Sequence, residues 1–375
     1  MNSISICLLA LAMLGWSSAA AAQPLPPAPV PVIYCTDLFH PHDDLDDHFD
    51  LACLYALAEL DIKAVVLDDF KGKSEQAKRP GRIPVGQLNA LTGRNVPWAV
   101  GCPVALANPE DPGADAADES RDGVKLILAT LKATPCPVSM IAVGSMRNLA
   151  AAFNREPALF REKVARLFLF IGDAKGSFRE WNVGLDKNAY VRIMNSGLPV
   201  YWVPCFDGGL WKNGGDASFW QAGHAELLRD TAAPLFNYFR YAIIQKDATK
   251  APLAYLHEPI PDEERRLVLS QRRNLWCSSV FAYVAGRRFV KRDDDCLTVP
   301  ASELRPGDKP HEVFSFLPVS VHVEPETGRE LLEESARAHQ VMRFHVLDQA
   351  TYARDMTSCT RHLYDELSRR SGSSK

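Results

Sequence analysis

The alternation of strand-like and helix-like patterns along the first two thirds of the chain restricts its fold more than any other feature. Compact apolar runs of strand length are followed repeatedly by stretches in which apolar residues recur at helical spacing. The expected strands are 30–35, 62–67, 138–143, 167–171 and 200–203. Strands joined through helices lie parallel and are covered on both faces. We therefore expect an α/β fold with an open, mostly parallel sheet, helices on both faces, and ligands bound at the carboxyl ends of the strands.

The pattern changes in the last third of the chain. Residues 227–244 and 267–285 are predicted to be helical, and the first of these stretches carries a group of aromatic residues at 236–241. Aromatic residues at helical spacing are more often part of the core than of a ligand site. Residues 316–323 alternate as a strand does, and residues 352–367 predict a closing helix.

The N-terminal segment predicts export. Residues 1–22 carry no charge, and their apolar run, 4–16, is too short to span a bilayer. Small residues at 20–22 suit a cleavage site, so residues 1–22 are interpreted as a signal peptide of a periplasmic or secreted protein. A membrane anchor is the alternative. A proline-rich leader, 23–30, and one domain, 31–370, are expected to follow.

Composition and charge exclude several classes of protein. A hydrophobic content of 47% is that of a folded globular protein. Lys and Arg number 42 against 46 Asp and Glu, and a net charge of -4 offers no basic surface for nucleic acid or for an anionic membrane. Eight cysteines follow the signal peptide, and their spacing does not determine which of them pair in an oxidising compartment.

Residues 36–50 hold the densest group of reactive side chains, with six Asp and three His in fifteen residues. The segment follows an expected strand and leads into a helix, where Asp46 and Asp47 are near the positive end of the helix dipole. Carboxylates this close repel one another unless a cation lies among them. Oxygen ligands favour Ca²⁺ or Mg²⁺, and the histidines leave a transition metal open. A solvated loop that caps the helix is the alternative.

The pair His40 and His42 in this segment resembles the His-x-His motif of metal-dependent amidohydrolases and related hydrolases. A hydrolase of that kind would use both histidines together with the surrounding aspartates. Such barrels also need histidines at later strand ends, and none occurs between Phe49 and Gly223. This hypothesis is therefore the weaker of two.

Three blocks of sequence carry a second resemblance. In the first, Asp37 ends a strand and Asp46-Asp47 open a helix. In the second, a strand is followed at 144–150 by Gly-x-x-x-Asn-Leu-Ala. The third and most specific block runs from 180 to 207: Glu-Trp-Asn, then an Asp before a helix, then Ser-Gly-x-Pro-Val and a strand that ends in Asp. In order and spacing the blocks resemble the inosine–uridine nucleoside hydrolase family, although the first loop is about five residues longer than in that family.

The resemblance implies hydrolysis of the N-glycosidic bond of ribonucleosides. It implies a Ca²⁺, or another divalent cation, that holds the ribose diol and the attacking water. By residue match, Asp37 would be general base and metal ligand, and the metal would also be bound by Asp47 and the carbonyl oxygen of Val143. Asp46, Glu180 and Asn182 would bind ribose hydroxyls. Carboxylates beside the ribose would stabilise an oxocarbenium-like transition state. The implied partner is a small-molecule nucleoside or riboside, and a homo-oligomer is left open.

One departure from the family concerns a late His-Asp pair, whose Asp completes the calcium site and whose His protonates the leaving base. Trp276 and Cys277 occupy those positions here, and Cys is a poor ligand for calcium. Two hypotheses follow: an N-ribosidase of altered specificity, or a secreted nucleoside- or ribose-binding protein without turnover. The histidines of the first loop are the candidates to replace the missing proton donor.

Other polar and aromatic residues of these blocks have structural interpretations. Asn148 is expected to cap or bridge a turn rather than to touch substrate. Asp186 and Asp207 are explained equally well as a helix cap and a strand-end residue or as ligands. Trp181 is expected to pack in the core.

Overall fold

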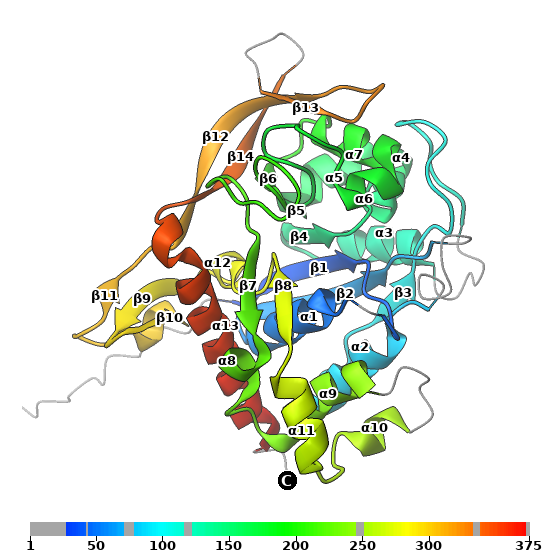
Figure 1. Cartoon of the computed structure of the whole chain (residues 1–375). Coiled ribbons are helices and arrows are strands. Elements are labelled where there is room, and N and C mark those ends of the chain that lie inside the picture. The colour runs from blue at the N-terminus through cyan, green and yellow to red at the C-terminus, as the bar shows by residue number, and fades with distance from the viewer. Residues whose placement is uncertain are drawn as a thin grey trace, which may run out of the picture.

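The computed structural model describes residues 28–42, 44–70, 79–115, 122–244, 251–332 and 338–372. The expected signal peptide and most of the leader lie outside the described residues. A nine-stranded sheet forms the centre of the molecule (Figure 1). Its strands are β1 (Val30–Thr36), β2 (Leu60–Leu67), β3 (Trp98–Val100), β4 (Val138–Val143), β5 (Val164–Phe170), β6 (Val200–Val203), β12 (Phe314–Val323), β13 (Glu330–Leu332) and β14 (His339–Val346).

The strand order is β13-β12-β14-β6-β5-β4-β1-β2-β3. From β14 to β3 all neighbouring strands are parallel, whereas β12 is antiparallel to both β13 and β14. The expected fold class is thus confirmed as an open, mixed and mostly parallel α/β sheet. The five strands expected from the first two thirds of the chain correspond to β1, β2, β4, β5 and β6.

Helices cover both faces of this sheet (Figure 1). The two faces are visible along β1, where Val32 and Tyr34 belong to one apolar core and Ile33 and Cys35 belong to the other. The first core includes α1 (Asp46–Ala56), α2 (Arg82–Thr92), α8 (His224–Leu228), α9 (Ala233–Ile244), α12 (Val280–Val284) and α13 (Gln349–Gly372). The second includes α3 (Gly123–Ala133), α4 (Arg147–Arg155), α5 (Pro157–Lys163) and α7 (Lys187–Met194).

The helix predicted over residues 267–285 is wrong. Helix α11 (Asp262–Leu269) ends early in this stretch, and β8 (Arg272–Leu275) then pairs antiparallel with β7 (Trp220–Gly223). Apolar residues on either side of β8 happen to share a helical spacing, and the strand pairing overrides it. The stretch 227–244 is also divided, because α8 ends at Leu228 and α9 begins at Ala233, three residues before its buried aromatic cluster.

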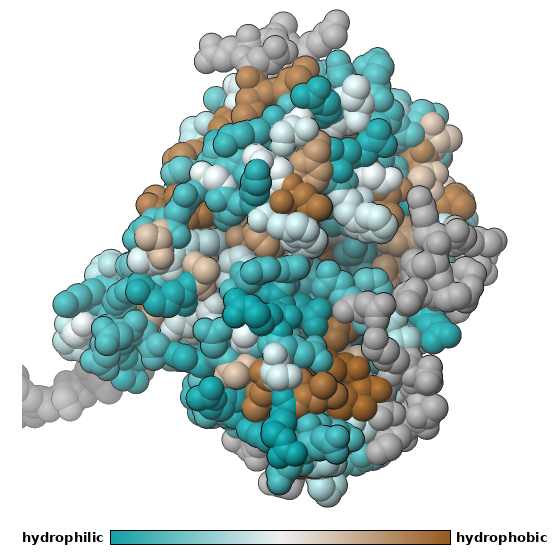
Figure 2. Space-filling model, in the orientation of Figure 1, coloured by the Kyte–Doolittle hydropathy of each residue, from teal (hydrophilic) through white to brown (hydrophobic). Residues whose placement is uncertain are grey.

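The remaining elements lie outside the nine-stranded sheet. They are α6 (Trp181–Leu185), α10 (Pro252–Tyr255), η3 (Ala301–Glu303), β9 (Arg288–Arg292), β10 (Asp295–Val299) and β11 (Lys309–Pro310). The face shown in Figure 2 is largely hydrophilic, with apolar residues gathered over α9 and α10. None of the helices in the described ranges is long and apolar enough to cross a membrane. The eight cysteines of these ranges are free thiols, and the sulfur atoms of Cys296 and Cys359 are 3.3 Å apart.

Candidate active site

A cavity of about 510 Å³ opens at the carboxyl ends of the central parallel strands. Its wall includes the last residue of β4, Val143, the last residue of β5, Phe170, and Cys205, which follows β6. This is the edge at which open α/β sheets bind ligands. All six site residues predicted from the sequence line the cavity: Asp37, Asp46, Asp47, Val143, Glu180 and Asn182.

Asp37 and Asp47 are held by the end of β1 and the start of α1. The hydroxyl Oγ1 of Thr36 donates a hydrogen bond of 2.8 Å to Oδ1 of Asp47 and accepts one of 3.1 Å from the main-chain N–H of Leu38. Gly144 has a φ of 92°, and a Cβ there would come within 2.8 Å of the Asp37 side chain. Only glycine therefore lets Asp37 lie directly against the turn that follows Val143.

Glu180 is fixed by main-chain donors at the N-terminus of α6. Its Oε1 accepts from the N–H of Asn182 at 2.9 Å, and its Oε2 accepts from the N–H groups of Gly172 at 3.2 Å and Val183 at 3.3 Å. The carboxylate therefore joins the end of β5 to α6. The side-chain oxygen of Asn182 is buried and has no hydrogen-bond partner among the described residues, so it is available to a ligand hydroxyl.

The carboxylates of the cavity repel one another. Burial, together with the negative charges of Asp68, Glu180 and Asp44, raises the pKa of Asp37 from its ordinary 3.8 to about 8. Burial and neighbouring aspartates also hold the pKa values of Asp46 and Asp47 well above the ordinary range. Among the residues that the structure describes, six carboxylates line the cavity and neither Lys nor Arg does: Asp37, Asp44, Asp46, Asp47, Asp50 and Glu180.

This donor set fits a hard divalent cation. The carboxylates of Asp37 and Asp47 and the carbonyl oxygen of Val143 are the ligand types that Ca²⁺ prefers. A cation would compensate charge that no Lys or Arg in the described part of the cavity wall offsets. As they lie, however, no three His, Cys, Asp or Glu side chains in the described ranges are grouped closely enough to hold a metal ion. The residues therefore have the right chemical type for a cation site, but their side chains do not come close enough together to form one in this structure.

The three histidines of the first loop are separated by the fold. His42 lines the cavity and contacts the ring of Phe39, with ring centroids 5.9 Å apart. His40 is buried and is not part of the cavity wall. Its ring stacks on the ring of Tyr241, with centroids 5.2 Å apart, and its centroid lies 5.7 Å from that of the His48 ring. A hydrolase site that uses His40 and His42 together gains no support from this arrangement. The aromatic residues of α9 are buried and line no part of the cavity, as expected for core residues.

Asp50 lines the cavity and was not among the predicted site residues. Its Oδ1 accepts hydrogen bonds from the main-chain N–H of Ser278 at 2.6 Å and from the Ser278 hydroxyl at 2.7 Å. Burial and the charge of Asp50 hold the pKa of the Cys277 thiol well above its ordinary value, which keeps this thiol protonated. A sequence signal existed, because Asp50 follows Asp46 by one helical turn and so shares its face of α1.

Aromatic rings form another part of the wall. The indole Nε1 of Trp276 donates a hydrogen bond of 3.0 Å to the carbonyl oxygen of Cys205. The Trp276 ring contacts Phe206 and Trp211, with centroids 5.8 and 6.1 Å away. Trp181 also lines the cavity with 74% of its surface exposed, so the expectation that it packs in the core is wrong. Trp181 is the first residue of the short helix α6, in which Val183 and Leu185 are the buried residues.

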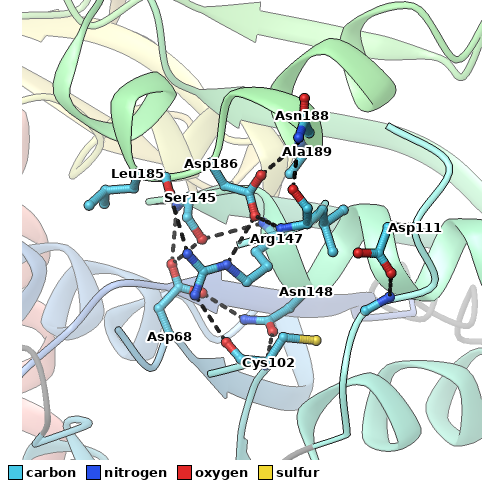
Figure 3. A network of polar contacts seen from close by, with 12 residues as sticks. Asp68, Cys102, Asp111, Ser145, Arg147, Asn148, Leu185, Asp186, Asn188 and Ala189 are labelled. Carbon is cyan, nitrogen blue, oxygen red and sulfur yellow. Dashed lines mark hydrogen bonds and ion pairs between the residues drawn. The ribbon is translucent and has the colours of Figure 1, made fainter. Parts of the chain in front are cut away.

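A buried polar network supports the loop after Val143 (Figure 3). Oδ2 of Asp68 accepts from the N–H and hydroxyl of Ser145 at 3.1 and 2.7 Å, and Oδ1 accepts from Nδ2 of Asn148 at 2.6 Å. Arg147 donates from Nε to Oδ2 of Asp186 at 3.0 Å. Burial raises the pKa of Asp68 to about 6, while Arg147 and Ser145 oppose that rise. The network fixes the start of α4 and with it the turn at Val143.

Three further polar residues of the sequence blocks have structural contacts, and the helix cap considered for Asp186 is found in the structure. Asn148 bridges Asp68 and the N–H of Cys102, and Asp186 caps α7 by accepting from the N–H of Ala189 at 3.0 Å. Asp207 follows β6, accepts from the N–H of Asp216 at 3.0 Å and lines no part of the cavity.

Comparison with known proteins supports the resemblance found in the sequence. The family model described as inosine-uridine preferring nucleoside hydrolase matches residues 37–259, which is more than half of the chain. The pyrimidine-specific ribonucleoside hydrolase RihA of Citrobacter koseri is 28% identical, over 46% of this chain and 58% of its own length. RihA of Salmonella arizonae is 27% identical over the same shares. The chain thus matches less than two thirds of the length of these curated relatives.

Solved structures extend the similarity of fold along almost the whole chain. A plant nucleoside hydrolase, PpNRh1, superposes with a TM-score of 0.54 at 15% identity, covering 91% of this chain and 99% of its own. A purine-preferring ribonucleoside hydrolase from Gardnerella vaginalis superposes with a TM-score of 0.53 at 15% sequence identity. The match covers 89% of this chain and 99% of that structure. The type III effector protein XopQ, complexed with adenosine diphosphate ribose, superposes with a TM-score of 0.52 at 16% sequence identity. The match covers 92% of this chain and 94% of that structure. At such identities the likeness concerns the fold alone.

Proposed function

Because the chain belongs to the inosine-uridine preferring nucleoside hydrolase family, we propose that it hydrolyses the N-glycosidic bond of ribonucleosides or of related N-ribosides. The observation that carries the proposal is the cavity at the carboxyl ends of the strands. Its lining includes every residue that the sequence match assigned to catalysis, to the cation or to the ribose. The fold neighbours are consistent with this proposal but do not extend it to a particular base.

In the proposed mechanism, the ionised carboxylate of Asp37 accepts a proton from the water that attacks C1′ of the ribose. A bound Ca²⁺, or another divalent cation, held by Asp37, Asp47 and the carbonyl of Val143, would acidify that water and orient the ribose diol. Asp46 and Glu180 accept hydrogen bonds from ribose hydroxyls. The surrounding negative charge stabilises the oxocarbenium character of the ribose in the transition state.

The test is release of ribose from a panel of purine and pyrimidine nucleosides by the purified protein in Ca²⁺. Asp37→Ala is expected to abolish release, because it removes the base and a cation ligand together. Glu263→Gln is the matched control, since it removes an exposed carboxylate on α11 far from the chemistry. No release of ribose from any nucleoside or activated riboside would contradict the proposal.

A second candidate function is that of a binding protein which recognises ribose or nucleosides without turnover. Two observations favour it: the Nε1 proton of Trp276 is already donated to Cys205, and the Cys277 thiol remains protonated beside Asp50. Neither group therefore replaces the His-Asp pair of the family. Micromolar binding of a nucleoside by calorimetry, with no release of ribose from any riboside, would favour this function.

We further propose that the protein is exported. The proposal is supported by the uncharged apolar segment and the small residues at 1–22. The N-terminal sequence of protein recovered from an exporting host tests it. A mature N-terminus at Gln23 is expected, and an intact Met1 would contradict it.

A further inference from the structure

The leaving group decides how much help an N-ribosidase must give. When the bond from C1′ to nitrogen breaks in a neutral nucleoside, both electrons stay with the base, which then leaves as an anion unless it receives a proton. A general acid that supplies this proton contributes about 10²–10⁴-fold in rate. The donors on the cavity wall therefore restrict the substrates that this chain can use.

Trp276 and Cys277 are poor proton donors. The only N–H of the Trp276 side chain is donated to the carbonyl oxygen of Cys205 at 3.0 Å, and indole is not an acid at neutral pH. The thiol of Cys277 has a pKa raised by burial and by Asp50. His42 contacts Phe39, in a group of rings separate from the one around Trp276.

The same wall suits a positively charged aromatic group. Its aromatic residues include Trp181, Trp211 and Trp276, and indole faces attract cations more strongly than other aromatic side chains. Among the residues that the structure describes, six carboxylates line the cavity and no Lys or Arg does, so a cationic ligand meets negative charge that no positive side chain of this described lining offsets. Arg273, which is not part of the described lining, has a guanidinium nitrogen 3.3 Å from a carboxylate oxygen of the lining residue Asp44.

Resting on the proposed N-ribosidase function, we propose that the preferred substrates are ribosides of a cationic aromatic ring, of the N-ribosyl pyridinium class. In this reaction the bond from C1′ to the ring nitrogen breaks and both electrons pass to the ring, which leaves as a neutral pyridine. Water adds to C1′ and gives its proton to Asp37. The products are ribose, the neutral pyridine and one proton, and no general acid takes part.

Three ribosides separate charge from leaving-group ability. Nicotinamide riboside is cationic and needs no proton on departure. The p-nitrophenyl riboside is neutral, and its leaving group also needs no proton. Inosine is neutral, and its leaving base does need a proton. With the wild-type protein in Ca²⁺, kcat/KM is expected to be at least about 100-fold higher for nicotinamide riboside than for inosine. It is also expected to exceed the value for the p-nitrophenyl riboside.

The outcomes distinguish the substrate class from the function. Efficient cleavage of inosine, at or above the rate for nicotinamide riboside, overturns the substrate class and leaves the N-ribosidase function in place. Equal rates for the two activated ribosides overturn the recognition of charge. Release of ribose from none of the three overturns the proposed function, and the substrate class falls with it.

Binding provides a measurement that is independent of turnover. Calorimetry should show tighter binding of cationic 1-methylnicotinamide than of neutral nicotinamide. Trp211→Ala should reduce that preference and Trp211→Phe should retain it, because the phenyl ring preserves an aromatic face at a half-exposed position. His42→Gln should leave the ratio of inosine to nicotinamide riboside turnover unchanged. A selective loss of inosine turnover would identify His42 as a proton donor and overturn the argument, as would equal binding of the two nicotinamides.

Discussion

Asp50 and Ser278 lie 228 residues apart in the chain, and two hydrogen bonds join them through one carboxylate oxygen. The contact ties α1, whose first turn carries Asp46 and Asp47, to the segment that presents Trp276 to the cavity. Ser278 has a φ of 21°, a conformation that side chains rarely adopt, so the carboxylate also holds a strained turn. Hydrogen bonds therefore join the two parts of the candidate site, the start of α1 and the segment around Trp276.

The first prediction concerns this link. Asp50→Ala should lower the free energy of unfolding by about 1–3 kcal/mol, because the buried N–H and hydroxyl of Ser278 lose their acceptor. In the metal-free protein, Asp50→Asn should lower the free energy of unfolding less than Asp50→Ala does. The asparagine keeps a hydrogen-bond acceptor for Ser278 and removes a negative charge that repels Asp46 and Asp47. Urea unfolding of both variants measures the difference. Equal stability of Asp50→Ala and the wild type would show that the contact is not formed.

The second prediction concerns pH in the metal-free protein. The pKa of Asp37 is raised in the folded state from 3.8 to about 8, so folding takes up a proton across this range. Because the folded state binds more protons than the unfolded state, the contribution of Asp37 to stability falls as pH rises from about 4 to about 8. Asp37→Asn should flatten this dependence, as measured by urea unfolding at several pH values in chelator.

Cation binding should oppose the same trend. A cation must displace the proton on Asp37, so its affinity should increase with pH up to about 8. Binding to the folded state alone raises the melting temperature by mass action, and Asp47→Ala should reduce the effect. If Ca²⁺, Mg²⁺, Mn²⁺ and Zn²⁺ at millimolar concentration all leave the melting curve unchanged and no metal copurifies, the cation assignment is wrong.

The third prediction concerns the sugar. Glu180 and Asn182 are expected to bind adjacent ribose hydroxyls, and the buried side-chain oxygen of Asn182 has no partner in the described part of the chain. Removing a hydroxyl that pairs such a group costs about 1–3 kcal/mol. Calorimetry should therefore show weaker binding of 2′-deoxyadenosine than of adenosine, and Asn182→Ala should narrow the gap. Equal affinities in the wild type would contradict these assignments.

The fourth prediction concerns the buried network behind the site. Arg147 has 3% of its side chain exposed and donates to Asp186, to the carbonyl of Asp69 and to the carbonyl of Cys102. Arg147→Met leaves buried carboxylates without a counterion, which should lower the free energy of unfolding by about 3–5 kcal/mol. Lys132→Met is the control, because its pair with Glu156 is largely exposed and should contribute less than about 1 kcal/mol. Similar losses for the two variants would contradict the role of the network.

The parts that the sequence predicted well are those with a local signal. Buried parallel strands form continuous apolar runs, so β1, β4 and β6 were located to within a residue. The carboxylates of the first loop and Glu180 were assigned through motifs of fixed spacing. The contacts of Asp50 with Ser278 and of Arg147 with Asp186 join residues 228 and 39 positions apart, and no pattern along the chain indicates either contact. Asp50 itself had a local signal, because it lies one helical turn after Asp46.

The last prediction concerns the positions of Trp276 and Cys277. If they occupy the places of the family's His-Asp pair, Trp276→His with Cys277→Asp should restore a proton donor and raise turnover of inosine by up to about 10²–10⁴-fold. Turnover of the p-nitrophenyl riboside should change much less, because that leaving group needs no proton. The ratio of the two rates therefore isolates the proton donor from effects on folding.

The new carboxylate at 277 would lie beside Asp50, whose charge already raises the pKa of the native thiol there. Like charges at this distance destabilise the protein, so the double variant should tolerate metal removal poorly. Adding Asp50→Asn should relieve the repulsion and recover stability without loss of the inosine gain. Cys277→Ala alone is the control that leaves the proton donor absent. An unchanged ratio of inosine to p-nitrophenyl riboside turnover in a folded double variant would show that these positions do not correspond to the pair.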